Sequence, residues 1–562
     1  MNSPVDEKFP YHVEDRLSVD DKTSEDHSSS SSSLSSRRRL PLGWKLLMIV
    51  LTCLCTFGNH WSNGLIVALK TTIIKETHIN NSEFATLVAI TNLINTFLCI
   101  GFGYCIDKWG GAPLSVIFAG FHLAGSLVMA GASTNNLNSY ALLIVGKVIA
   151  AIGDGSLDNA QHRIFSTYFA PGRGFAFSIG TIWGIANLAQ FTGQSTANIV
   201  TTKLGSYSYA LWIGAAIAMF SFICAAAVVF LDRYLRANYA VTDQTSGKRH
   251  TGQTRRAAFN FRAMRNLPLT FWIVVAFSAF ENAGVQSFVS ISTQFAQQRL
   301  QQGAVIGGWV SSFYLLLPAC LTPFLGIYID AFGQRIGFLF LSALTFLVSM
   351  ILLRFSHTVP PFITAYVFYA LSQARDVRLN QSVTPAPQVE IVRNIIPNPQ
   401  DYATGFAIKK SVVQASIVII TTAAGKMQDD SPNNSLEPAV SLWLAYALIS
   451  VVISGGLLFV SYFMPTLLPA ARLSQVSPRV LSAEVECLCE KIGLVVPKDE
   501  VGEVSEVKEK EKRLKAPEPN KAWLRWTCLG AGAAIIIIGW ILFGVGIAWG
   551  VHANVVAGTV GD

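Results

Sequence analysis

Charged residues are scarce in this chain of 562 residues. Lysine, arginine, aspartate and glutamate together make up 14% of it, whereas 51% is hydrophobic. Soluble globular chains carry about 25% charged residues, so a shortfall of this size over such a length excludes a soluble multidomain enzyme. The composition instead indicates a membrane protein with many helices.

Cysteine is also scarce, and catalytic signatures are missing. Most of the nine cysteines lie in apolar segments, which argues against a disulfide framework. Cys487 and Cys489 form a single C-x-C in a charged segment, which is too little for a metal site. No phosphate-binding loop of the form G-x-x-x-x-G-K-[ST] occurs. We therefore expect neither an enzyme nor a resident metal or cofactor.

The sequence does contain a series of apolar runs of about 20 residues, the length at which a helix crosses a bilayer. Twelve such runs come in two groups of six, and one more follows near the C-terminal end. The predicted spans are 44–69, 82–105, 113–132, 139–167, 174–200, 207–231, 269–292, 304–327, 335–355, 361–394, 401–425, 440–464 and 523–550.

Polar segments divide these spans into predicted domains. The first segment is of low complexity and rich in serine, a composition that predicts disorder. The predicted domains are a disordered tail (1–43), a six-helix bundle (44–231), a basic central loop (232–268), a second six-helix bundle (269–465), a polar tail (466–521) and a final helix with a short end (522–562).

The positions of basic residues predict the orientation in the membrane. Arg37, Arg38 and Arg39 precede the first span, and eight further lysines and arginines lie between Arg233 and Arg265. Basic residues accumulate on the cytosolic side, and the six spans between these clusters allow both to face it. Thirteen spans then place the C-terminus in a lumen or outside the cell. The net charge of +8 therefore reflects topology and not nucleic-acid binding.

A short pattern, G-x-x-x-D-x-x-G, occurs after the second and after the eighth predicted span. Glycine allows helices to approach closely, and the aspartate can cap the following helix or pair with a base. Matching positions in the two halves indicate an internal duplication. The residues are Gly103, Asp107, Lys108 and Gly110 in the first copy and Gly326, Asp330, Gly333 and Arg335 in the second.

The duplicated motif, the number of helices and the central loop resemble the major facilitator superfamily over roughly residues 44–465. The resemblance implies an all-α membrane fold of two six-helix bundles, to which this chain adds one C-terminal helix. It also implies secondary transport of a solute bound near the bilayer midplane. The two motif loops would act in the conformational switch.

The fourth predicted span resembles one branch of that superfamily, the lysosomal dipeptide transporters known as major facilitator superfamily domain-containing protein one. The chain departs from this branch at Gly155, where the branch has an acid, and at Ile185, where it has an arginine. These departures keep another solute class open. The residues that match the branch are Gly153, Ser156, Leu157, Ala160 and Gln161.

Ionisable residues at bilayer depth indicate function by default, because they are costly there. The fourth span has Lys147, Asp154, Asp158 and His162 within about 80° of arc on one helical face. We expect Lys147, Asp154 and Asp158 to bind a charged substrate end or a proton. In the alternative, Asp154 pairs with Lys147, while Asp158 and His162 face water near the end of the helix.

Three further candidates lie in other spans. Glu281 in the seventh span is either a substrate or proton site or a helix–helix hydrogen-bonding group. His60 in the first span either lines the cavity or packs in the bundle. Lys410 in the eleventh span is either functional or reaches toward the membrane surface.

The tenth predicted span, 361–394, is too long for a single crossing. One interpretation is a broken helix whose charged residues line the cavity. The other is an insertion, Ala374 to Gln381, that interrupts a span of ordinary length.

Together these features predict a secondary transporter that moves a small polar solute by alternating access, with proton coupling as an option. The branch resemblance implies dipeptides or amino-acid-like solutes and a lysosomal or vacuolar membrane, and it leaves room for an accessory membrane subunit. One alternative is a transporter of a carboxylate or sugar at the plasma membrane. Another is a non-transporting sensor or scaffold that signals through residues 466–521.

Overall fold

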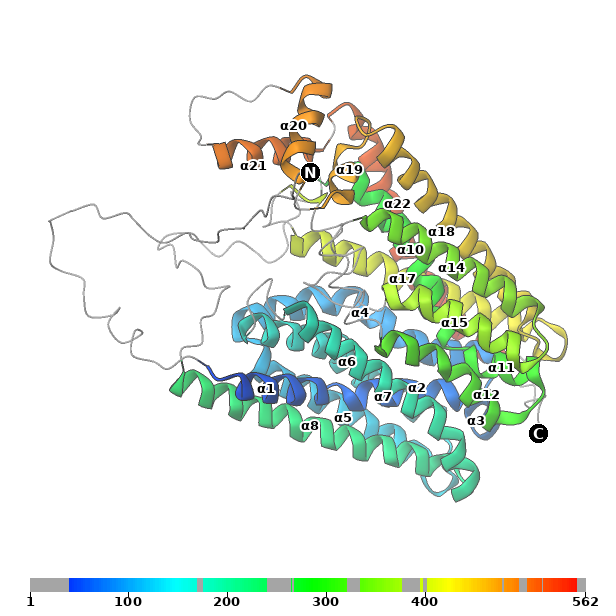
Figure 1. The fold of residues 1–562 in the computed structure, drawn as a ribbon. Coiled ribbons are helices and arrows are strands. Elements are labelled where there is room, and N and C mark those ends of the chain that lie inside the picture. Colours follow the sequence, from blue (N-terminus) through cyan, green and yellow to red (C-terminus); the bar gives the residue numbers. More distant parts are fainter. Residues whose placement is uncertain are drawn as a thin grey trace, which may run out of the picture.

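The protein is helical almost throughout the part of the chain that its structure describes (Figure 1). Ten helices in that part are long and apolar enough to cross a membrane, which agrees with the predicted fold class. The computed structural model describes residues 40–168, 175–239, 264, 267–320, 334–376, 395–397, 402–477, 480–494, 503–517 and 519–552.

The first bundle contains the first six predicted spans. The span predicted at 44–69 is interrupted after Leu54 and again at Leu69, so that three helices follow one another. The helices are α1 (Leu42–Leu54), α2 (Phe57–Ala68), α3 (Lys70–Thr77), α4 (Asn81–Trp109), α5 (Gly111–Ala132), α6 (Tyr140–Tyr168), α7 (Phe175–Leu204) and α8 (Tyr207–Asn238).

The second bundle contains the next six spans. The tenth predicted span begins with α15, which ends at Asp376, and residues 377–394 lie outside the described part. The choice between an insertion and a broken helix therefore stays open. The helices are α10 (Leu269–Val289), α11 (Ser292–Leu300), α12 (Gly303–Ser312), the 3₁₀ turn η3 (Phe313–Leu315), α14 (Arg335–Phe355), α15 (Val359–Asp376), α17 (Tyr402–Asp429) and α18 (Glu437–Phe463).

The remaining helices follow the second bundle. The segment predicted as a polar tail folds into α19 (Pro469–Gln475), α20 (Leu481–Ile492) and α21 (Glu503–Leu514) at one end of the molecule (Figure 1). The last helix, α22 (Ala522–His552), is the predicted thirteenth span. It packs against α17 and α10 of the second bundle and against α4 of the first.

Close backbone contacts hold α5 and α6 of the first bundle together. A Cβ atom added to Gly153 would lie 2.2 Å from the Phe118 carbonyl oxygen, and one added to Gly125 would lie 2.4 Å from the Ala150 nitrogen. Only glycine permits helices to approach this closely. The first bundle is therefore packed partly backbone against backbone.

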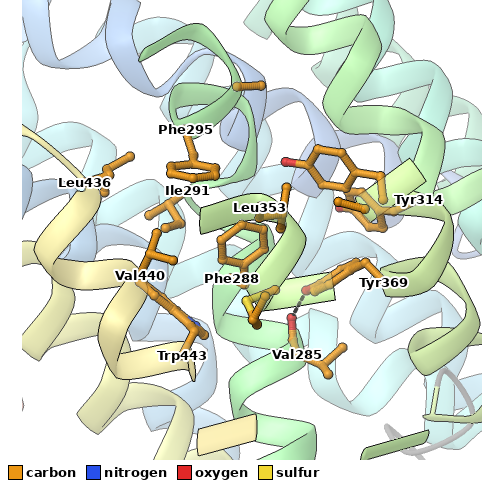
Figure 2. Close-up of a cluster of buried hydrophobic side chains, with 14 of the residues drawn as sticks. Val285, Phe288, Ile291, Phe295, Tyr314, Leu353, Tyr369, Leu436, Val440 and Trp443 are labelled. Atoms are coloured by element: carbon orange, nitrogen blue, oxygen red, sulfur yellow. Dashed lines mark hydrogen bonds between the residues drawn. The ribbon is translucent and has the colours of Figure 1, made fainter. Parts of the chain in front are cut away.

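Aromatic rings fill the core of the second bundle. Phe288 packs against Phe295, Tyr369 and Trp443 with ring centroids 5.5–5.9 Å apart, and all four side chains are buried (Figure 2). The Tyr369 hydroxyl donates a hydrogen bond to the Val285 carbonyl, which satisfies its polar end inside the core.

Candidate functional site

A cavity of about 260 Å³ lies between the two bundles. Helices α2, α4, α6 and α7 line it from the first bundle, and α10, α17 and η3 line it from the second. Pockets for drug-sized ligands measure roughly 300–1,000 Å³, so this cavity suits a small solute. Nine side-chain amides line it: Asn59, Asn63, Asn92, Asn95, Asn187, Gln190, Asn282, Gln286 and Gln414.

The structure brings four of the predicted site residues together at this cavity: His60, Lys147, Asp154 and Asp158. His60 Nε2 lies 3.7 Å from Asp158 Oδ1, so that α2 and α6 share an acid and a base. Lys147 Nζ donates to Asn63 Oδ1 at 3.3 Å. These pairs place both signs of charge on the wall formed by the first bundle.

Lys410 contributes a charge from the opposite wall. It lines the cavity from α17, and its Nζ is buried and has no hydrogen-bond partner among the described residues. A buried ammonium without a partner is costly. Lys410 is attracted to Asp158 electrostatically, and its hydrogen-bond donors have no acceptor among the described residues.

Asp154 has a different partner from the one that the sequence suggested. Its Oδ1 lies 2.6 Å from Nδ1 of His122 on α5, whereas Lys147 attracts Asp154 only electrostatically and has its hydrogen bond with Asn63. His162, expected in that alternative to face water, is only 3% exposed and lies outside the cavity lining.

Glu281 lies away from the cavity. It is fully buried, and its Oε1 accepts a hydrogen bond from Ser342 Oγ of α14 at 2.5 Å. The next residue, Asn282, lines the cavity instead, because successive residues point about 100° apart around a helix. The position of Glu281 matches the helix–helix interpretation and does not favour substrate binding.

The branch motif packs α6 against its neighbours. Ser156, Leu157 and Ala160 are at most 1% exposed, and Gly153 contacts the α5 backbone. Gln161 Nε2 donates to the Thr52 carbonyl and to Thr56 Oγ1, where the chain breaks between α1 and α2. Such a break leaves backbone carbonyls without helical partners, and Gln161 satisfies one of them.

The first motif loop is a tight turn between α4 and α5. Gly110 adopts a φ of +91°, a conformation that side chains rarely allow. Lys108 is exposed, with its Nζ 5.5 Å from the ring centroid of Trp109. Gly103 and Asp107 lie within α4, their surroundings fall outside the described part, and their role stays a prediction.

The second motif loop falls largely outside the described residues, since only Arg335 of its predicted residues is described. Gly326, Asp330 and Gly333 are not. Arg335 is buried, and its Nη1 donates to the Ser474 carbonyl of α19 at 3.0 Å. This predicted switch residue thus connects α14 to the folded tail.

Hydrogen bonds join the two bundles where α17 ends, which we call the Asp429 end. Asp429 Oδ1 accepts from the backbone nitrogen and the side chain of Asn81, each at 3.0 Å. Its Oδ2 accepts from Ser82 N at 2.9 Å and Ser82 Oγ at 2.5 Å. Because Asn81 begins α4, a carboxylate of the second bundle caps a helix of the first. Lys70 adds a bond from its Nζ to Gln428 Oε1 at 3.0 Å.

Sequence reasoning missed His122 and the amides of α4 and α7. The α7 amides do carry a signal, because they recur every three or four residues and so share one face: Asn187, Gln190, Gln194 and Asn198. His122 carries none, since a single histidine in an apolar helix is typical of a packing residue.

Comparison with known families and proteins gives consistent results. The family model described as Major Facilitator Superfamily matches residues 52–374. The chain is 23% identical over 419 residues to the lysosomal dipeptide transporter MFSD1 of Danio rerio, covering 73% of this chain and 86% of that protein. It is also 23% identical over 426 residues to the Homo sapiens protein of the same name, with the same coverage.

Solved transporters share the fold. The xylose transporter XylE from E. coli, in a partially occluded inward-open conformation, superposes with a TM-score of 0.55 at 14% identity, covering 75% of this chain and 98% of that one. The nucleoside transporter NupG superposes with a TM-score of 0.54 at 13% identity, covering 74% and 98%. At such low identity the likeness establishes the fold alone.

Proposed function

Because the chain belongs to the Major Facilitator Superfamily, we propose that it moves a small zwitterion, such as a dipeptide, across a membrane by alternating access. The cavity between the bundles carries the proposal. It combines a carboxylate on one wall, Asp158, with an ammonium that has no described hydrogen-bond partner on the other, Lys410. A zwitterion presents the complement of both groups.

Distances along α6 favour one pairing for a dipeptide. Lys147 and Asp158 are eleven residues apart, about 16 Å along the helix axis. The charged ends of an extended dipeptide are only about 7 Å apart, and Lys147 is already bonded to Asn63. We therefore assign the substrate amine to Asp158 and the substrate carboxylate to Lys410.

The membrane and the orientation follow from the relatives and the charges. The named relatives are lysosomal dipeptide transporters, which supports a lysosomal or vacuolar membrane here. The basic residues on both sides of the first bundle support a cytosolic N-terminus. The Asp429 end is then the lumenal end, and the hydrogen bonds of Asp429 hold it closed in this conformation.

Uptake by purified protein in liposomes tests the substrate assignment, with radiolabelled alanyl-alanine as the probe. We expect Lys410→Gln and Asp158→Asn each to reduce initial uptake about tenfold or more, because a hydrogen bond to a charged group is worth about 1.5–3 kcal/mol. Lys409→Gln is the matched control, since Lys409 is also buried on α17 but does not line the cavity. Melting temperatures of all variants monitor folding.

Competition with blocked dipeptides distinguishes the two ends. In the wild type, amidating the carboxylate or acetylating the amine of the competitor should abolish inhibition. Lys410→Gln should lose only the discrimination against the amide, and Asp158→Asn only the discrimination against the acetyl group. Equal discrimination in both variants and the wild type would contradict the assignment.

A second candidate substrate is a sugar or nucleoside. The nine amides of the cavity favour it, because amides hydrogen-bond hydroxyl groups as both donors and acceptors. Inhibition of alanyl-alanine uptake by neutral sugars, retained in Lys410→Gln, would support this candidate over the zwitterion.

A further inference from the structure

A buried acid–base pair lies beside the proposed substrate site. His122 on α5 and Asp154 on α6 are 4% and 3% exposed, and His122 Nδ1 lies 2.6 Å from Asp154 Oδ1. On the other side of the ring, Nε2 lies 3.4 Å from Ser126 Oγ. The imidazole thus lies between the Asp154 carboxylate of α6 and the hydroxyl of Ser126, which is one turn further along α5.

One atom of this pair is available to the cavity. Asp154 lines the cavity, and its Oδ2 is buried without a hydrogen-bond partner in the part of the chain that is described. A carboxylate oxygen with no donor at this depth is costly when ionised. The pair therefore has a site where a proton arriving from the cavity relieves a buried negative charge.

Other titratable groups lie on α6 and on the helices that pack against α5 and α6. Lys147 and Asp158 lie on α6 itself, and buried thiols lie on α1 (Cys55) and α8 (Cys224). Across the cavity, α17 contributes Lys410. Asp158 lies beside His60, and Lys147 is hydrogen-bonded to Asn63 while it also attracts Asp154 electrostatically.

We propose that His122 and Asp154 form the proton-carrying site of the transporter, separate from the groups that hold the solute. The proposal rests on the proposed transport function. A proton from water in the cavity binds the pair, whose net charge rises from −1 to 0. When the cavity faces the other side, the same proton leaves to water and the net charge returns to −1.

A pH titration of the full-length protein in lipid tests the site without any substrate. Infrared difference spectra between about pH 5 and 8, where histidine titrates, should show carboxyl and imidazole bands of the pair in the wild type. Asp154→Asn should remove the carboxyl band, and His122→Gln should remove the imidazole band and shift the midpoint. His162→Gln, which alters another buried histidine outside the cavity lining, should leave them unchanged. Spectra identical in the wild type, Asp154→Asn and His122→Gln would overturn the proposal.

Transport in liposomes provides the functional readout, again with radiolabelled alanyl-alanine. In His122→Gln, accumulation driven by a pH gradient should fall to the level without a gradient, while exchange of internal for external dipeptide persists. A structural defect would reduce both. If wild-type accumulation is the same with and without the pH gradient, the proton site is overturned but the transport function is not. Absence of any wild-type uptake overturns the dipeptide assignment and leaves the infrared titration to decide the proton site.

Discussion

The two bundles have matching helix arrangements but are held together differently. In the first, α6 packs on α5 through glycines such as Gly153, and its acids are paired with histidines of neighbouring helices. In the second, an aromatic core around Phe288 and Trp443 fills the interior. Its buried acid, Glu281, is bonded to another helix and not directed at the cavity.

This difference in packing means that the two bundles position their cavity-lining residues in different ways. Close backbone contacts fix the helix that carries Lys147, Asp154 and Asp158, because glycine leaves little room for it to shift. Large interlocking rings make the second half a rigid block that presents Lys410 and a few amides. A wall with several charged residues thus faces, across the cavity, a wall with Lys410 and uncharged polar side chains.

The largest effect should come from emptying the aromatic core. Trp443→Ala removes a fully buried ring that packs edge-to-face against Phe288 and donates from Nε1 to Ser287 Oγ at 2.9 Å. We expect the free energy of unfolding to fall by about 3–5 kcal/mol, measured by chemical denaturation in detergent. Phe355→Ala, an exposed aromatic of the same bundle, should change it little. Equal losses would mean that the second bundle does not depend on this core.

A smaller effect is expected at the junction between the bundles. Asp429→Ala removes all four hydrogen bonds to the start of α4, but Asp429 is only half-buried, so water replaces much of what is lost and the total cost is about 1.5–3 kcal/mol. A cysteine at Val289, with the exposed Cys320 replaced by serine, should then react about ten times faster with an impermeant maleimide added at the Asp429 end. Asp430→Ala is the control.

Asp430 is suited to that control because its ion pair is confined to the end of α17. Its Oδ1 accepts from Lys426 Nζ one turn earlier on α17 and joins no helix of the first bundle. If both variants accelerate labelling equally, the junction is not specific to Asp429.

The smallest effect should come from a single methyl group. Gly153→Ala places a Cβ against the Phe118 carbonyl oxygen and should lower the free energy of unfolding by about 1–3 kcal/mol. In the second bundle, Gly456 has no atom within 4 Å of such a Cβ. Gly456→Ala should therefore be neutral or stabilising by up to about 1 kcal/mol. A larger loss of unfolding free energy for Gly456→Ala than for Gly153→Ala, measured by the same denaturation, would contradict the claim that close glycine contacts are specific to the first bundle.

Most of the fold could be predicted because hydrophobic length is a local property. The span predicted at 113–132 is Gly111–Ala132, and that predicted at 440–464 is Glu437–Phe463. The interruptions of the first span could not be predicted, because the hydrogen bonds that stabilise the break after Leu54 come from Gln161, more than one hundred residues away. The folding of residues 466–521 into helices was likewise hidden by their polarity.

The candidate site could be predicted only in part. Lys147, Asp154 and Asp158 were recognisable because ionisable residues are rare at membrane depth. Their partners were not, since His122 and His60 lie on other helices and pairing depends on rotation and depth. The same limit applies to Glu281, because nothing in the sequence states whether it or Asn282 faces the cavity.

The last helix also constrains how the two halves move. Gly550 of α22 accepts from Asn80 Nδ2 in the first bundle at 3.0 Å, and Trp549 lies over Lys426 of the second. Trp549 and Gly550 are adjacent, so rocking that keeps both contacts must pivot about a point near the C-terminal end of α22. The last turn of α22 then acts as a pivot that both halves share, and displacements grow with distance from it.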